Sequence, residues 1–298
     1  MTGTSAARRR FCEHSFRSIL MAAAGASVVA LAAIVIFLVS QAVPLLRETS
    51  LTDFLFSTEW YPTEDPPYFG IGALFMGSIS VACVTAVIAV PLGILVAGAI
   101  HCAMPSRVRR IVKPLIELMA AFPSVVIGLV GMTVLAPFLQ QTFGIATGLN
   151  MLNASIMLAF MVIPSIASIS EDALRNVPSA IREASLALGA TRWETLVRVE
   201  LRWAMGGIGT AVMLGISRAI GETMVVLMAA GGAAIIPETI FDPVRPMTSS
   251  IAAEMAEAAV GSAHYHALYG AGFVLFLVTF AFNLAAWFAS KKLQMGGR

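Results

Sequence analysis

The stretch 118–170, LMAAFPSVVIGLVGMTVLAPFLQQTFGIATGLNMLNASIMLAFMVIPSIASIS, contains no Asp, Glu, Lys or Arg. A helix that crosses a bilayer needs about 20 predominantly apolar residues, so this stretch is long enough for two such helices. A polar patch between Gln140 and Asn153 marks the turn between them. Pro123 and Pro164 are expected to kink the two helices, because proline cannot donate the backbone hydrogen bond of a helix interior.

Four further stretches are nearly free of charge. Residues 18–46, 66–106 and 258–290 contain none of the four charged residue types, and 203–237 contains only Arg218 and Glu222. The first stretch is too long for the apolar core of a signal peptide, so we expect it to remain as a helix. The sequence therefore predicts an all-α, polytopic membrane protein with six transmembrane helices, roughly over residues 18–46, 70–101, 114–139, 152–170, 206–236 and 266–290.

The composition excludes several classes of protein. Hydrophobic residues make up 58% of the chain and charged residues only 12%, and the mean hydropathy is +0.85. A soluble domain is about one quarter charged. The net charge of +2 provides no basic field for nucleic acid. A soluble enzyme, a nucleic-acid-binding protein and a disordered chain are therefore all disfavoured, and a protein embedded in the lipid bilayer remains.

The basic residues predict the orientation. Lys and Arg favour the cytoplasmic side of short loops. All but three of them lie in the N-terminal segment, the 102–113 loop, the 171–205 loop or the C-terminal segment; the exceptions are Arg47, Arg245 and Arg218. We therefore expect a cell (inner) membrane protein with both termini in the cytoplasm. Residues 1–17 form the cytoplasmic N-terminus, residues 18–298 form the helix bundle, and the 171–205 loop faces the cytoplasm.

Motifs of the common catalytic and metal sites are absent from the sequence. No G-x-x-x-x-G-K-[ST] phosphate-binding loop and no H-E-x-x-H zinc motif occurs, and the three cysteines lack metal-ligand spacing. His264 and His266 are expected to pack or to lie at the membrane boundary rather than to bind a metal. The sequence thus predicts no enzyme, no metal site, no disulfide and no cofactor in this chain.

The 171–205 loop predicts a compact helix–turn–helix. Ser179 is expected to cap a first helix, and Gly189 to end it, since only glycine enters the left-handed region without strain. Thr191 is expected to cap a second helix. An amphipathic loop can lie on the lipid surface, but that role favours a basic polar face. This loop carries five acidic residues and five arginines, which favours docking into another protein.

The same loop resembles the E-A-A-x-x-x-G motif of ABC importer permeases. Residues 183–189 read E-A-S-L-A-L-G, and the I-x-L-P that normally follows reads Val199-Glu200-Leu201-Arg202, with Arg202 in place of the proline. In that family the loop inserts into a cleft of the ATP-binding subunit. The resemblance implies that Glu183, Ala184 and Gly189 are coupling residues, with Thr191, Arg192 and Trp193 as near neighbours.

Motifs along almost the whole chain are similar to those of PstC-type permeases of phosphate ABC importers. They are Trp60-Tyr61-Pro62, Phe69–Gly72, Ile88–Ile94, Phe122–Leu129 and Arg218–Met224. The resemblance implies the type I ABC importer permease architecture. It also implies as partners a second homologous permease of the PstA type, two ATP-binding subunits that hold ATP and Mg²⁺, an extracytoplasmic phosphate-binding protein, and the lipid bilayer, without nucleic acid.

Arg218 and Glu222 are charges inside a predicted span. Being four residues apart, they would share one face of a helix and form an ion pair. Charged residues within a membrane usually face the bundle interior and mark a functional site. In one interpretation Arg218 attracts the phosphate oxyanion and Glu222 holds the arginine in place, with hydroxyls from Ser217 and Thr223. In the other, the pair is a structural salt bridge between helices.

Two rival functions remain open from the sequence. The chain could be a permease for another oxyanion, such as molybdate, tungstate or sulfate. It could also be a secondary transporter or channel that works without ATPase partners. The second alternative would need a coupling-ion site or inverted repeats, and we find no internal repeat in the sequence.

Overall fold

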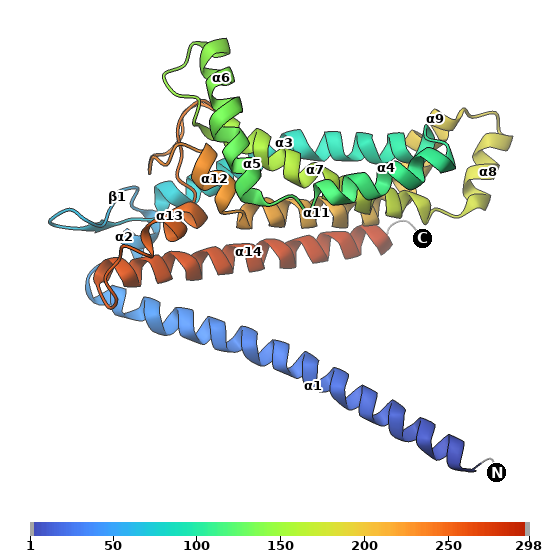
Figure 1. Cartoon of the computed structure of the whole chain (residues 1–298), viewed down its shortest axis with the longest axis horizontal. Coiled ribbons are helices and arrows are strands. Elements are labelled where there is room, and N and C mark those ends of the chain that lie inside the picture. The colour runs from blue at the N-terminus through green and yellow to red at the C-terminus, as the bar shows by residue number, and fades with distance from the viewer. Residues whose placement is uncertain (1–2, 296–298) are drawn as a thin grey trace.

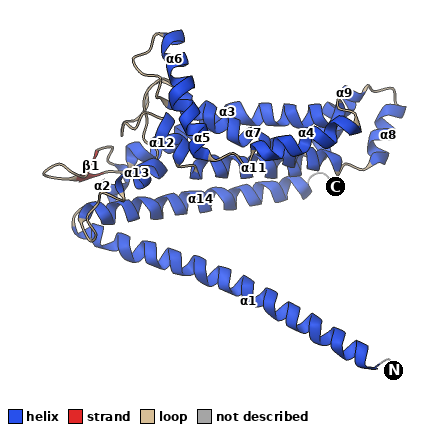
Figure 2. Cartoon of the chain, in the orientation of Figure 1, coloured by secondary structure: helices blue, strands red, loops and turns tan. Residues whose placement is uncertain are grey.

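A computed structural model describes residues 3–295 of the chain. Four long helices run side by side and form the centre of a bundle, and Figure 2 shows that most of the remaining chain is also helical. The helix α7 contacts both α3 and α11, and α14 contacts α11. These four helices are α3 (Gly72–Cys102), α7 (Met151–Arg175), α11 (Met205–Gly221) and α14 (Ala263–Met295).

The helix α1 diverges from this bundle along most of its length (Figure 1). It covers Gly3–Ala42 and continues into the short 3-10 helix η1, Val43–Arg47. Only the region near η1 approaches α14 closely in Figure 1, and none of the most apolar part of this first span is buried within the chain. The surface of α1 is therefore left for lipid or for another protein.

Short elements cover the two ends of the bundle. At one end lie α2, a two-stranded antiparallel hairpin that pairs Trp60 with Phe69, and α13 (Figure 1). At the other end lie α8 and α9. The bounds of the short elements are α2 Leu51–Phe56, β1 Trp60–Tyr61, β2 Tyr68–Phe69, α4 Ser106–Met119, α5 Ser124–Val130, the π-helix η2 Gly131–Leu135, α6 Ala136–Phe143, α8 Ser179–Ala187, α9 Arg192–Thr195, the π-helix η3 Leu196–Glu200, α10 Leu201–Trp203, α12 Met224–Ala229 and α13 Met247–Glu254.

Five helices of the described chain are long and apolar enough to cross a membrane, and there are six if one bent pair is counted as a span. The predicted spans 18–46, 70–101, 152–170 and 266–290 correspond to α1 with η1, α3, α7 and α14. The last two are longer than predicted, because each helix continues beyond the apolar stretch into charged residues at its C-terminal end. The all-α membrane architecture is confirmed.

The predicted position of the third span is wrong. We expected it at 114–139, but the chain forms the separate amphipathic helix α4 up to Met119, and the apolar span covers Ser124–Phe143. The break falls at 120–123, directly before α5. Pro123 adopts an extended conformation there, with ψ of 127°, and becomes the first flanking residue of the next helix. Instead of the expected kink, the chain has a full helix break directly before α5.

The fifth span, expected as one helix over 206–236, is also wrong. The helix α11 ends at Gly221, and Glu222 is extended, with ψ of 136°, before the short helix α12 begins. Gly231 and Gly232 then adopt positive φ values, and a side chain at Gly231 would meet the carbonyl of Leu149 at 2.5 Å. The tertiary contacts of this segment override its apolar composition. The helix 192–203 joins α11 at an angle of 75°.

Close approach of the central helices depends on two glycines. A Cβ atom at Gly93 on α3, or at Gly215 on α11, would lie 2.7 Å from the side chain of Ile166 on α7. Ile166 itself is fully buried. Small residues at such contacts let membrane helices pack closely without a hydrophobic driving force. The two glycines thus allow α3 and α11 to close on α7 from two sides.

Candidate functional site

The 171–205 loop folds as the predicted helix–turn–helix. The first helix, α8, ends at Ala187, and Gly189 follows with φ of +89°, as expected for a glycine stop. The expected cap at Ser179 is wrong. Pro178 is the flanking residue, Ser179 is already helical, and no side chain caps this helix. The fixed φ of a proline suits it to a helix start, which explains how α8 begins without a hydroxyl cap.

Thr191 caps the second helix, as predicted. Its Oγ1 accepts a hydrogen bond from the backbone N–H of Glu194 at 3.2 Å, and the Thr191 backbone N–H donates to Glu194 Oε2 at 2.9 Å. This reciprocal pair is a capping box, which satisfies two backbone donors that a helix start leaves free. Local hydrogen bonds therefore start α9 directly after the turn that follows α8.

The surface of this turn is open. Leu188 is 90% exposed and Trp193 is 61% exposed, which is unusual for large apolar side chains in an aqueous loop. All six predicted coupling residues are exposed on the same two helices and the turn between them. They are Glu183, Ala184, Gly189, Thr191, Arg192 and Trp193. The structure thus brings the predicted coupling residues together on one projecting surface (Figure 1).

Arg202, which replaces the proline of the motif, lies inside the helical run that leads away from this turn. The run continues through α10 to Trp203, and the chain bends only after it, at Ala204. Arg202 is exposed, whereas Ala204 is buried. The exit of the loop is therefore a sharp bend at the start of α11, formed without a proline.

Arg218 does not pair with Glu222. Its Nη2 donates to the carbonyl oxygen of Ala120 at 2.9 Å, and its Nη1 donates to Ser165 Oγ at 3.3 Å. Glu222 Oε1 instead accepts from the backbone N–H of Met224 at 3.2 Å, at the start of α12. The predicted ion pair is wrong because α11 ends between the two residues, so they do not share a helix face.

The other two predicted path residues lie apart from each other. Ser217 Oγ donates to Asn283 Oδ1 on α14 at 2.7 Å, so it faces the opposite side of α11 from the Arg218 contacts. Thr223 lies in the break after α11, beside Glu222, and its hydroxyl donates to the carbonyl of Gly221 at 3.4 Å. The structure therefore does not gather Ser217, Arg218, Glu222 and Thr223 into one cluster.

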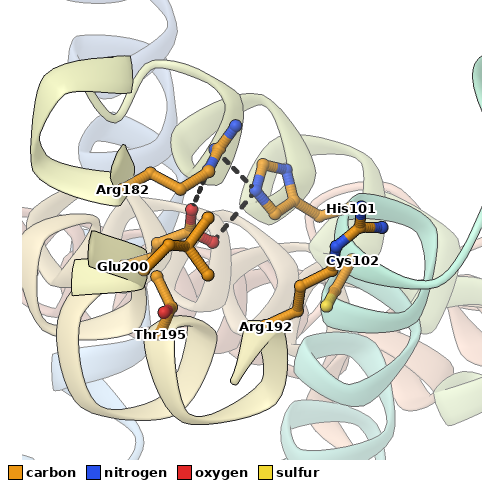
Figure 3. Close-up of a pocket in the computed structure, with 7 residues that line it drawn as sticks. His101, Cys102, Arg182, Arg192, Thr195 and Glu200 are labelled. Carbon is orange, nitrogen blue, oxygen red and sulfur yellow. Dashed lines mark hydrogen bonds and ion pairs between the residues drawn. The ribbon is translucent and has the colours of Figure 1, made fainter. Parts of the chain in front are cut away.

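A buried charge cluster at the base of the coupling loop was missed in the sequence. Glu200 accepts from Arg182 Nε, and its Oε2 lies 3.1 Å from His101 Nε2 (Figure 3). The Glu200 side chain is only 4% exposed. The available signal was its spacing: Leu196, Glu200 and Ala204 recur every four residues, and all three are buried. An acid in an apolar stripe of this kind needs a partner.

Comparison with known proteins places this geometry in context. The family model described as "Binding-protein-dependent transport system inner membrane component" matches residues 89–294. The chain is 38% identical to the probable ABC transporter permease protein YqgH of Bacillus subtilis, over 98% of this chain and 95% of that protein. It is 35% identical to the phosphate transport system permease protein PstC of Mesorhizobium japonicum, over 76% of this chain and 74% of that protein.

A solved structure shares the fold. The chain superposes on an inward-facing conformation of the MetNI methionine ABC transporter with a TM-score of 0.54. The match covers 75% of this chain and 94% of that chain, at 19% sequence identity. At this identity the likeness concerns the fold alone.

Proposed function

The chain belongs to the family of binding-protein-dependent transport system inner membrane components, and from this membership we propose that it is the phosphate permease subunit of an ATP-driven importer. The exposed turn around Gly189 is the observation that carries the ATP-driven part of the proposal. Similarity to the PstC protein supports phosphate as the solute, and Arg218 supplies a cation inside the bundle. The YqgH protein, which is more similar, carries no solute in its name.

The coupling surface is the basis of the partner assignment. Leu188 and Trp193 give it apolar area, and Glu183 and Arg192 give it charges of both signs. A surface of this kind suits insertion into a protein cleft better than contact with anionic lipid. The proposed partner at this surface is an ATP-binding subunit, and the importer would contain two such subunits. Those subunits would hold ATP and Mg²⁺, so this chain needs no cofactor and is not itself an enzyme.

The remaining partners follow from the architecture. A type I permease forms half of a translocation path, so a second homologous permease of the PstA type would supply the other half. An extracytoplasmic phosphate-binding protein would deliver the solute at the hairpin end of the bundle. The start of α1 and the end of α14 lie toward the end that carries α8 and α9 (Figure 1). This supports an inner-membrane protein with both termini in the cytoplasm.

The charge of Arg218 is available for an anion. Its partners are a backbone carbonyl and a hydroxyl, which are both neutral, so the guanidinium keeps its net positive charge. Arginine presents a planar set of donors that matches phosphate oxygens. In the proposed path Arg218 attracts the anion. Glu222 caps α12 rather than holding the arginine, and Ser217 serves packing against α14.

Co-purification tests the ATP-driven part. The full chain, expressed with its neighbouring permease and ATP-binding subunits, is expected to co-purify with an ATPase in mild detergent. Glu183→Arg should abolish this association, because it inverts a charge on the coupling surface. Glu257→Arg is the matched control, since Glu257 is also exposed but lies near α13 at the other end of the bundle. Retention of the ATPase and of transport by the Glu183→Arg variant would refute the docking surface.

Uptake competition tests the solute. Vesicles that contain the assembled importer should take up radiolabelled phosphate only with ATP and the binding protein. Excess sulfate, molybdate or tungstate should leave the phosphate uptake within about twofold of the uptake measured without a competitor. Suppression of phosphate uptake by one of these oxyanions would assign the permease to that anion instead. Uptake that needs no ATPase would favour a secondary transporter or channel.

A further inference from the structure

Glu200 joins three separate elements at the base of the coupling loop. It lies at the end of η3, Arg182 projects to it from α8, and His101 projects to it from the last turn of α3 (Figure 3). Arg182 Nη2 also lies 2.9 Å from His101 Nε2. One buried carboxylate therefore contacts a helix of the coupling loop and a membrane-spanning helix at the same time.

The contacts continue from α3 into two more helices. Arg109 on α4 donates to the last carbonyls of α3, at 3.1 Å to Ile100 and 2.5 Å to His101. Lys113, one turn further along α4, lies 2.7 Å from the carboxylate of Glu171 on α7. The polar groups thus form a continuous series from α8 through η3, α3 and α4 to α7. The series lies entirely at the end of the bundle that carries the coupling loop.

Apolar packing at this end does not reach α8. The buried cluster there contains Ala97, Leu174, Leu196 and Ile208, which belong to α3, α7, η3 and α11. No residue of α8 is fully buried. Leu186 in this helix and Leu188, which directly follows it, are both exposed. Besides the covalent turns and the hydrogen bond between Ser185 and Thr195, the contacts of Arg182 with Glu200 and His101 connect α8 to the rest of the chain.

We propose that Glu200 is a positioning residue that couples α8 to α3, so that a displacement of α8 by an ATP-binding subunit moves the cytoplasmic end of α3. The proposal rests on the proposed coupling role of the loop and adds the route by which its movement enters the bundle. A buried charge held by two partners is costly to leave unpaired, so the elements that carry the partners move together.

Measurements of transport and of subunit assembly distinguish the positioning role of Glu200 from a purely stabilising role. The assembled importer with Glu200→Gln should keep its ATP-binding subunits and its basal ATP hydrolysis within about twofold, while phosphate uptake per ATP hydrolysed falls at least tenfold. Arg182→Gln should give the same result and is a milder change, because Arg182 is 37% exposed. Arg198→Gln is the matched control, since Arg198 lies on η3, as Glu200 does, and is 76% exposed. An unchanged ratio of uptake to hydrolysis in both variants would overturn the proposal.

A distance measurement tests the proposed coupling of α8 to α3 directly and does not depend on the solute. Spin labels at Ala103→Cys and Ala187→Cys, with the native cysteines replaced, report on the ends of α3 and α8. Their separation should stay constant between the nucleotide-free and ATP-bound importer, and should change or broaden by several ångström with nucleotide in the Arg182→Gln variant. The same response of this distance to nucleotide in the unmutated importer and in the Arg182→Gln variant would overturn the proposed coupling of α8 to α3. Failure of the unmutated chain to bind any ATPase would instead overturn the proposed function.

Discussion

Among the residues that the structure describes, Arg218 has a backbone carbonyl and a hydroxyl as partners and no acidic side chain. The carbonyl of Ala120 is free to accept from it because the helix is interrupted at 120–123, and Ser165 provides the second acceptor from α7. Non-helical backbone at membrane depth is tolerated where other groups satisfy it. The guanidinium of Arg218 thus donates a hydrogen bond to the carbonyl that the helix break leaves free, and it keeps its positive charge. The structural interpretation and the path interpretation of this residue are therefore compatible.

Substitution of Arg218 separates these two roles. Arg218→Gln retains a donor but loses the charge, so phosphate uptake should fall at least tenfold while assembly with the partner subunits persists. Arg218→Lys should keep part of the uptake, because the charge remains without the planar donors. Ser165→Ala, which removes one acceptor and no charge, should leave uptake within about twofold. Loss of the assembled complex in Arg218→Gln would instead assign a packing role to this residue.

At the scale of single elements, the coupling turn depends on one backbone conformation. Gly189 has φ of +89°, and a Cβ atom there would meet nothing within 4 Å. A side chain is therefore opposed only by backbone strain, which costs about 1–2 kcal/mol for an ordinary residue in a left-handed conformation. Asparagine tolerates this region better than alanine.

We expect Gly189→Ala to lower ATP-driven uptake several-fold and Gly189→Asn to recover part of it. The physical reason is that the strain disfavours the exposed turn, which presents the coupling residues. Uptake and retention of the ATP-binding subunit should be measured for both variants in the assembled importer. Equal activity of the alanine variant and the unmutated chain would show that the turn conformation is not needed for coupling.

The start of α7 depends on a turn formed by residues 238–242. Asp242 accepts hydrogen bonds from the backbone and hydroxyl of Thr239 and from the backbone of Glu238, and these bonds hold the pKa of Asp242 below its usual range. The backbone carbonyl of Asp242 accepts in turn from Met151 N–H at 3.0 Å, at the first residue of α7. The turn therefore fixes one end of the central helix.

Loss of this carboxylate should loosen the start of α7. Asp242→Ala is expected to speed amide hydrogen exchange at Met151 and Leu152, with little change in the middle of the helix. A group with a lowered folded pKa stabilises above its unfolded pKa, and this contribution disappears as the pH falls through the folded value. Acidification below the usual carboxyl range should therefore lower the protection of the same amides in the unmutated chain, measured relative to their intrinsic exchange rate at each pH, and should leave their protection in the variant unchanged. Glu257→Ala is the exposed control.

At the scale of the whole molecule, the bundle has two chemically different ends. One carries the hairpin with the acidic residues Glu64 and Asp65 at its exposed tip, and the other carries the coupling turn with the buried cluster at its base. Between them, much of α1, α5 and α14 exposes apolar side chains. Such surfaces in an isolated chain are the areas that lipid and a second permease would cover.

The proposed orientation predicts a labelling pattern. In a chain whose native cysteines are replaced, a cysteine at Glu64 should react with a membrane-impermeant maleimide in intact spheroplasts. A cysteine at Leu188, which is 90% exposed, should react only after the cells are opened. Labelling of position 188 from outside intact cells would reverse the topology and remove the coupling turn from the reach of any ATPase.

The sequence by itself determined the membrane spans with clear apolar stretches, the glycine stop at 189 and the helix cap at Thr191. Each of these depends on hydrophobic length or on interactions within a few residues, so local sequence is sufficient. Only the tertiary structure decided where the third and fifth spans break and which groups contact Arg218 and Glu200. Ala120 lies 98 residues from Arg218, and His101 lies on another helix from Glu200. The partners of a buried charge depend on how distant helices pack, and no periodicity along the chain encodes that arrangement.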